Sequence, residues 1–225
     1  MTSWFLAPAW PRVLPFALFL LVLAARGLPV WDGLPIDSRW LYAVQAGLAL
    51  AALIAYRRQY SELNAARRPA ASSWLFALVA GIAVFGLWIG LDWDFATIGE
   101  PQAAFVPLDH EGKLVWSLVV VRIAGAALVV PVIEELFWRS LLMRWLDSRD
   151  FLALDPARVS ARALGLSALV FGIEHPQWLA GLIAGLVYGE LYRRSGNLWV
   201  PIAAHALTNL LLGIWVVATG AWHYW

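Results

Sequence analysis

The sequence predicts an all-α fold, a polytopic bundle of about seven or eight transmembrane helices. Hydrophobic residues make up 62% of the 225 residues and charged residues only 14%. With a mean hydropathy of +0.70, this composition is too apolar for a soluble globular domain. The apolar residues also form runs long enough to cross a bilayer, separated by charged segments. We therefore expect a single transmembrane domain over residues 1–225, surrounded by lipid.

Composition also limits the chemistry. The chain has no cysteine, which excludes disulfides, thiolate nucleophiles, zinc–thiolate sites and iron–sulfur clusters. Its formal net charge is +1, and the basic residues cluster at the ends of apolar segments, so no nucleic-acid partner is expected. Any reaction must use carboxylates, histidines and hydroxyl groups.

The first half of the chain predicts three spans. Residues 13–25 follow Arg12 and resemble a signal-peptide core, but without a convincing cleavage site they are better explained as a first transmembrane helix. Residues 41–56 and 74–91 form the next two apolar runs. Between them lies the densest arginine cluster, made of Arg57, Arg58, Arg67 and Arg68. The positive-inside rule places this loop in the cytoplasm, and the acidic segment 92–112 on the outer side.

The second half begins with an apolar stretch from residue 114 to residue 146, interrupted by Arg122. It exceeds one span of about 20 residues, so we expect an interfacial lead-in over 114–121 and a separate span over 123–146. The remaining predicted helices cover residues 163–174, 178–192 and 198–219, with a turn at His175 and Pro176.

Two glutamates and an arginine interrupt the run of residues 131–146, PVIEELFWRSLLMRWL. A charge near the middle of a membrane costs about 2.5 to 3.5 kcal/mol on insertion scales, which makes such residues functional candidates. Glu135 and Arg139 are four apart on one helix face and favour a structural ion pair. Glu134 points elsewhere and is the freer carboxylate, either a reactive group or a buried acid bonded to a backbone carbonyl.

Two further motifs hold two of the four histidines, FGIEH at residues 171–175 and HALTN at residues 205–209. His205 and Asn209 share a helix face, and Phe171 lies one turn before His175, so that it can pack beneath the ring. From the arginine-flanked ends, Glu134, His175, His205 and Asn209 lie about 10 to 20 Å deep. Each histidine alone fits an interhelical hydrogen bond, and Asn209 alone fits helix packing. Their common depth favours a reaction centre.

As a set, these motifs resemble the CAAX protease and bacteriocin-processing family, whose pattern is two glutamates with an arginine four after the second, then Phe-x-x-x-His, then His-x-x-x-Asn or Asp. The resemblance implies an all-helical intramembrane endopeptidase of about eight spans with its catalytic core at 114–219. It implies that Glu134 and His175 activate a water, and that His205 and Asn209 form an oxyanion hole of neutral donors. Three residues would support them, namely Glu135, Arg139 and Phe171.

The expected partner is a membrane-associated protein or peptide substrate. The family was long described as metalloproteases, so Zn²⁺ stays open as a cofactor. The candidate ligands come from three helices without HExxH spacing, which favours a metal-free glutamate mechanism. A weaker resemblance to the bacterial subgroup encoded with exosortase-type sorting systems implies an inner-membrane protein that processes exported proteins. A non-enzymatic alternative is a proton-coupled carrier, or an immunity or scaffold protein.

Overall fold

The computed structural model describes residues 3–26, 28, 31, 37–64, 69–99 and 105–225. Within these ranges the protein is all-helical, as predicted, with seven helices and no β-strand. Their bounds are α1 Ser3–Arg26, α2 Leu41–Tyr56, α3 Ala71–Gly90, the continuous helix Trp116–Met143, α6 Ala161–Glu174, α7 Trp178–Ser195 and α8 Trp199–Thr219. The continuous helix, called the long helix below, consists of α4 Trp116–Ala124, a π-helical stretch Gly125–Val129, α5 Val130–Glu134 and a second π-helical stretch Glu135–Met143.

Five of the described helices are long and apolar enough to cross a membrane, which makes this an integral membrane protein. They are α1, α2, α3, the long helix and α8. Helices α6 and α7 are not among them, so the described residues contain five candidate spans where seven or eight were expected. Helix α6 has 14 residues, or about 21 Å, against a hydrocarbon core of about 30 Å. Helix α7 carries three charges, Glu190, Arg193 and Arg194, in its last six residues.

The expected break between residues 121 and 123 is wrong, because the helix runs through Arg122 without interruption. The Arg122 guanidinium carbon lies 4.3 Å from the centre of the Tyr42 ring and 5.7 Å from that of Phe105. These aromatic faces accommodate the cation inside the bundle. At 28 residues the helix is about 40 Å long and exceeds the hydrocarbon thickness, a mismatch that tilting relieves.

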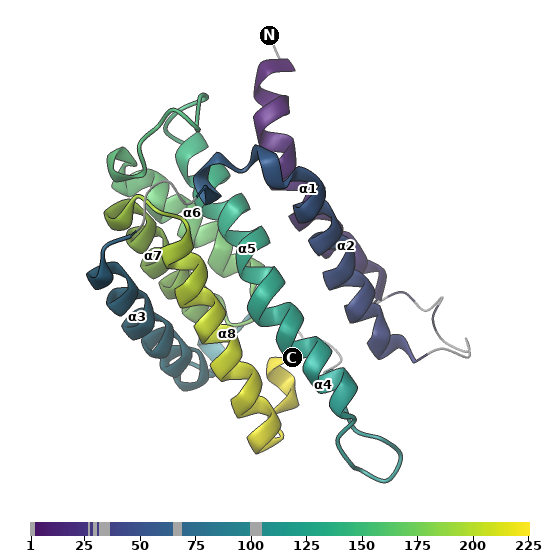
Figure 1. Cartoon of the computed structure of the whole chain (residues 1–225). Coiled ribbons are helices and arrows are strands. Elements are labelled where there is room, and N and C mark those ends of the chain that lie inside the picture. The colour runs from purple at the N-terminus through teal and green to yellow at the C-terminus, as the bar shows by residue number, and fades with distance from the viewer. Residues whose placement is uncertain (1–2, 27, 29–30, 32–36, 65–68, 100–104) are drawn as a thin grey trace.

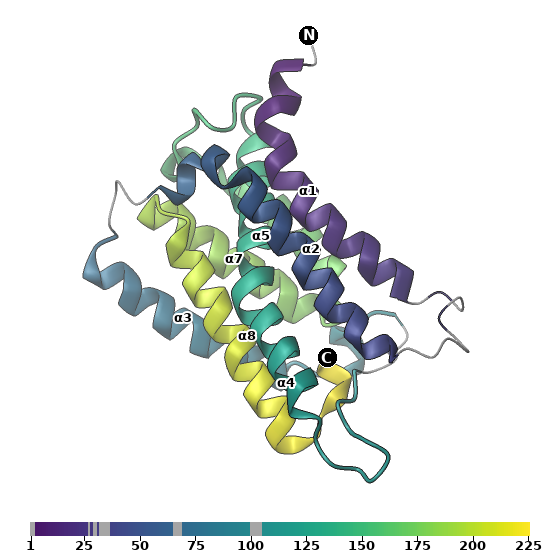
Figure 2. The ribbon, with the colours of Figure 1, turned by 45° about the vertical axis from the view of Figure 1, so that its right-hand side comes forward.

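The long helix lies between two groups of helices (Figure 1). Helices α1 and α2 pair on one side of it, and α3 packs against α8 on the other (Figures 1 and 2). Helices α6 and α7 form a closely packed hairpin that also contacts α3 and the second π-helical stretch. The three motifs therefore reach one region from the long helix, from the α6–α7 turn and from α8.

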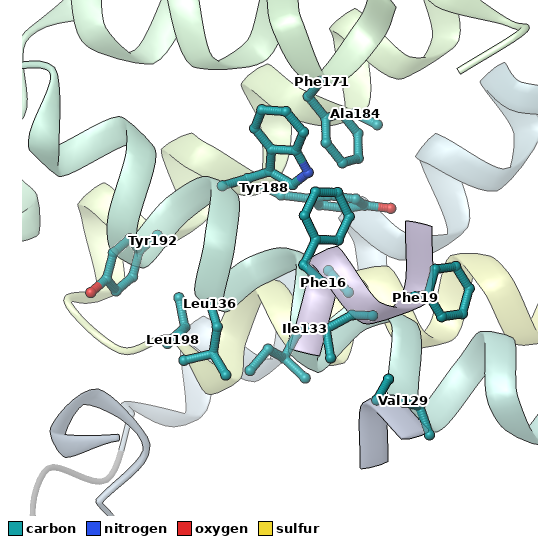
Figure 3. Close-up of a cluster of buried hydrophobic side chains, with 14 of the residues drawn as sticks. Phe16, Phe19, Val129, Ile133, Leu136, Phe171, Ala184, Tyr188, Tyr192 and Leu198 are labelled. Atoms are coloured by element: carbon teal, nitrogen blue, oxygen red, sulfur yellow. The ribbon is translucent and has the colours of Figure 1, made fainter. Parts of the chain in front are cut away.

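Aromatic packing fills the centre of the bundle, where the rings of Phe16, Phe171 and Tyr188 gather (Figure 3). Trp138 is 4% exposed, and its ring lies 5.8 Å from both Phe16 and Phe171, edge-on to each. This cluster joins α1, the long helix, α6 and α7, and so fixes the helices that carry the first two motifs.

The loop after α3 folds over the turn between α6 and α7. The Ile98 amide donates to the Pro176 carbonyl at 2.8 Å, and Trp178 Nε1 donates to the Phe95 carbonyl at 3.0 Å. One end of the candidate site is thereby covered. Three charged residues used to predict the sidedness of the loops, Arg67, Arg68 and Glu100, lie outside the described residues, and the orientation stays a prediction.

Candidate active site

Glu134 is buried inside the bundle, between the two π-helical stretches of the long helix. The residue is 6% exposed, so it does not face the hydrocarbon. Its Oε2 atom is buried and has no hydrogen-bond partner among the described residues. More than nine in ten buried polar groups find a partner, so this carboxylate oxygen remains available for a hydrogen bond.

The neighbouring Glu135 links the first motif to the third. Its Oε2 lies 3.1 Å from Arg139 Nε, which confirms the predicted ion pair, and its Oε1 lies 3.0 Å from His205 Nδ1. The contact with His205 was not predicted from the sequence. A carboxylate can only accept here, so the proton on Nδ1 belongs to His205. A neutral His205 then has no proton at Nε2, and it can donate there only as an imidazolium.

His175 closes the α6 helix because of the proline that follows it. A residue before proline is driven out of the helical region, and His175 has φ −101° and ψ 140°. Its Nδ1 lies 2.8 Å from the Phe171 carbonyl oxygen. Since a carbonyl only accepts, Nδ1 carries the proton and Nε2 keeps its lone pair. Nε2 of His175 can therefore accept a proton or a hydrogen bond.

The Phe171 ring is the common contact of the three motifs. Its centre lies 4.7 Å from that of His175, as the spacing predicted, and 6.3 Å from that of His205. The Arg139 guanidinium carbon lies 4.3 Å from the same ring. The structure thus joins Glu135, Arg139 and both histidines around one phenylalanine.

Two residues of the site escaped the sequence analysis, Tyr188 and Thr208. The Tyr188 ring stacks on His205 with centres 4.9 Å apart and an interplanar angle of 19°. Its hydroxyl donates to Thr208 Oγ1 at 2.7 Å, and Thr208 in turn bonds the Gly81 carbonyl at 2.9 Å. The Tyr188 ring stacks on the face of the His205 imidazole, and Glu135 accepts a hydrogen bond from its Nδ1. An intramembrane tyrosine gives no sequence signal for such a role, because it resembles a packing residue.

Asn209 does not share a partner with His205, although both lie on one face of α8. Its Nδ2 donates to the Ala126 carbonyl at 2.8 Å. That carbonyl lies in the first π-helical stretch, where the Val130 amide bonds Gly125 five residues back. In the same register Ala126 would need an amide at residue 131, which is Pro131 and has none. Asn209 fills this gap, and its Nδ2 keeps a second hydrogen.

The described residues show no grouped set of side chains that could hold a metal ion. Catalytic zinc takes three protein ligands, whereas nowhere in the described ranges do three His, Asp or Glu side chains form a group that could hold a metal ion. The Nδ1 contacts of His175 and His205 leave Nε2 as the nitrogen of each ring that could take a ligand. Metal dependence of the protein stays a matter of prediction.

A buried ionic cluster supports the long helix one residue beyond Arg139. Glu62 pairs with Arg12, accepts a hydrogen bond from the Ser140 hydroxyl, and lies 3.8 Å from Arg144 Nη2. Burial raises the pKa of Glu62, but the hydrogen bonds and charge of Arg12, with the Ser140 hydroxyl, outweigh it and hold the pKa below its usual value. This cluster ties α1 and the loop after α2 to the helix of the first motif.

Comparison with known proteins agrees with the motifs. Residues 115–211 match the family model described as type II CAAX prenyl endopeptidase, Rce1-like. The match covers all three motifs and confirms the resemblance drawn from them. No curated protein and no solved structure matches the chain.

Proposed function

Residues 115–211 form an Rce1-like domain of the type II CAAX prenyl endopeptidase family, and on this premise we propose that the protein hydrolyses a peptide bond by a metal-free glutamate mechanism. The observation that carries the proposal is the buried Oε2 atom of Glu134, which has no hydrogen-bond partner in the described structure. A water bound there would satisfy the carboxylate and stand ready for activation. His175 Nε2, which keeps its lone pair, would be the second acceptor for that water.

In the proposed reaction, Glu134 takes a proton from the water as the water oxygen bonds to the substrate carbonyl carbon. The carbonyl oxygen becomes an oxyanion. Glu134 then gives the proton to the amide nitrogen as the carbon–nitrogen bond breaks, which leaves a carboxylic acid and an amine. His175 orients the water in this scheme.

His205 would stabilise the oxyanion as an imidazolium, not as the neutral donor expected from the sequence. The reason is the Glu135 carboxylate at Nδ1, 3.0 Å away, which leaves Nε2 able to donate only when both nitrogens are protonated. Before reaction the carboxylates of Glu134 and Glu135 face Arg139 and the imidazolium, and afterwards the oxyanion replaces the charge that Glu134 has lost. The second hydrogen of Asn209 Nδ2 would be the other donor, and each such donor is worth about 10²- to 10³-fold in rate.

The proposed substrate is a membrane-associated protein, reached from within the bilayer. The weaker resemblance to the subgroup encoded with exosortase-type systems supports an exported protein of a bacterial inner membrane over a prenylated one. The densest arginine loop supports a cytoplasmic position for the segment between α2 and α3.

The test compares N-terminal peptides of membrane proteins from cells that carry the wild type, Glu134→Gln or Glu190→Gln. Glu190 is a matched control, since it pairs with Arg193 and Arg194 at the end of α7, away from the motifs. We expect peptides that depend on the protein to vanish only with Glu134→Gln, while that variant still purifies as a folded protein in detergent. Undiminished cleavage by Glu134→Gln would refute the mechanism.

A further inference from the structure

An apolar groove lies between the start of α1 and the end of the long helix, outside the candidate active site. Ala9, Trp10 and Val13 line one wall, and Phe137, Leu141, Leu142 and Trp145 line the other. The groove has a volume of about 310 Å³, and its walls present no polar surface. Trp10 is 49% exposed, so the groove opens to the surroundings of the protein.

Water is a poor occupant for this groove. Each ordered water needs two to four polar partners. The walls offer none. Both helices that form the groove are long and apolar enough to span a membrane, so lipid acyl chain is the apolar material that could fill it.

Arginine side chains lie at the end of the groove. The Arg149 guanidinium carbon lies 4.7 Å from the centre of the Trp145 ring, and no carboxylate in the described ranges pairs with it. The Phe151 ring packs against the groove residues Ala9 and Leu141. The guanidinium carbons of Arg12 and Arg144 each lie 5.5 Å from the centre of this ring.

Acidic residues accompany these arginines, since the segment 147–155 also holds Asp147, Asp150 and Asp155. Arg12 and Arg144 share the single carboxylate of Glu62. Asp147 is held by the amide and hydroxyl of Ser160. The site thus combines a dry apolar slot with an unpaired cation at its mouth, which is the pattern that complements an anionic lipid.

We propose that this groove binds one acyl chain of an anionic phospholipid from the leaflet on the arginine-rich side, with the lipid phosphate at Arg149. The two tryptophans of the groove, Trp10 and Trp145, are of the residue type that prefers the membrane interface, where a headgroup meets its chains. The proposal does not depend on proteolysis, because its readout is bound lipid.

Native mass spectrometry of the full-length protein, incorporated into vesicles of equal parts phosphatidylglycerol and phosphatidylcholine and then extracted, tests the groove. Val13→Trp fills the slot from α1, and Leu142→Trp fills it from the long helix; both positions are only partly buried. The control is Val120→Trp on the same long helix, where the side chain is 61% exposed. We expect the retained lipid to be lost in both groove variants and kept in the control.

The headgroup is tested by Arg149→Gln, with Arg158→Gln as an exposed control in the same segment. One basic residue near an anionic surface is worth about a fivefold preference. We expect Arg149→Gln to lower the ratio of retained phosphatidylglycerol to phosphatidylcholine by that factor, and Arg158→Gln to leave it unchanged. Lipid retention that survives either groove variant, or a ratio that Arg149→Gln leaves at the wild-type value, would overturn the proposal.

Discussion

Gly172 is the point where the backbones of α6 and α7 touch, three residues before His175. A Cβ atom there would lie 2.7 Å from the Trp178 carbonyl oxygen and 2.8 Å from the Leu182 amide nitrogen. Both are backbone atoms and cannot turn aside, so in Gly172→Ala the helices must separate by more than half an ångström. The turn that carries His175 must move with them.

The loss of stability is expected to be modest. Overpacking costs about 1 to 3 kcal/mol, and the better helix propensity of alanine returns about 1 kcal/mol. A net loss of up to about 2 kcal/mol lowers the melting temperature by about 2 to 4 °C per kcal/mol in a chain of this size. Activity should fall further, because a displacement of about 1 Å in a reacting group can cost about 10²-fold in rate.

Gly165→Ala on the same helix is the matched control, since no atom lies within 4 Å of a Cβ built there. Peptide cleavage and melting in detergent are measured for both variants. We expect Gly165→Ala to be fully active and as stable as the wild type or slightly more so. Wild-type activity in Gly172→Ala, or equal damage in the two variants, would refute the argument from close approach.

Glu62→Gln should lower stability at neutral pH by about 3 kcal/mol, because it leaves Arg12 buried without its carboxylate. The pKa of Glu62 is lower in the folded protein than in the unfolded chain, so its contribution to stability is complete above the ordinary value of about 4.3 and disappears as pH falls through the folded pKa. The melting temperatures of variant and wild type should therefore converge in acid. A difference that stays constant with pH would contradict this. Tyr188→Phe should keep the stack on His205 and most of kcat, whereas Tyr188→Leu should lose both; equal kcat values would show that the stack is unimportant. Asn209→Ala should lower the free energy of unfolding by about 1 to 3 kcal/mol, because the Ala126 carbonyl loses its hydrogen-bond donor. Adding Pro131→Ala should restore the stability measured by melting without restoring cleavage. If the double variant recovers both, Asn209 has a purely structural role.

Local relations in this protein could be predicted from sequence, because helical periodicity fixes them. The bounds of α2 follow from an apolar run that ends in arginines, and the structure has the same bounds, Leu41–Tyr56. The ion pair between Glu135 and Arg139 and the packing of Phe171 on His175 are both i, i+4 relations. Such contacts need only the helix itself.

Relations between distant segments could not be predicted in the same way. Glu135 and His205 are 70 residues apart, and Ser140 and Glu62 are 78 apart. Each pairing depends on how helices rotate about their axes when they pack, which the hydrophobic pattern of a membrane helix leaves nearly free. The break predicted at Arg122 was wrong for the same reason. The aromatic ring that packs against the Arg122 guanidinium belongs to Tyr42 on another helix.

The π-helical stretches show how a local rule and a distant contact combine at the site. Pro131 withholds the amide that Ala126 would need in the π-helical register, and the vacant carbonyl is met by Asn209 from α8. The proline therefore leaves free the carbonyl that Asn209 of α8 contacts. Since His205 lies one turn before Asn209, the same contact sets the level at which His205 meets Glu135. A missing hydrogen-bond donor four residues before Glu135 thus provides one of the contacts between the third motif and the first, and a sequence pattern of charged residues alone does not reveal it.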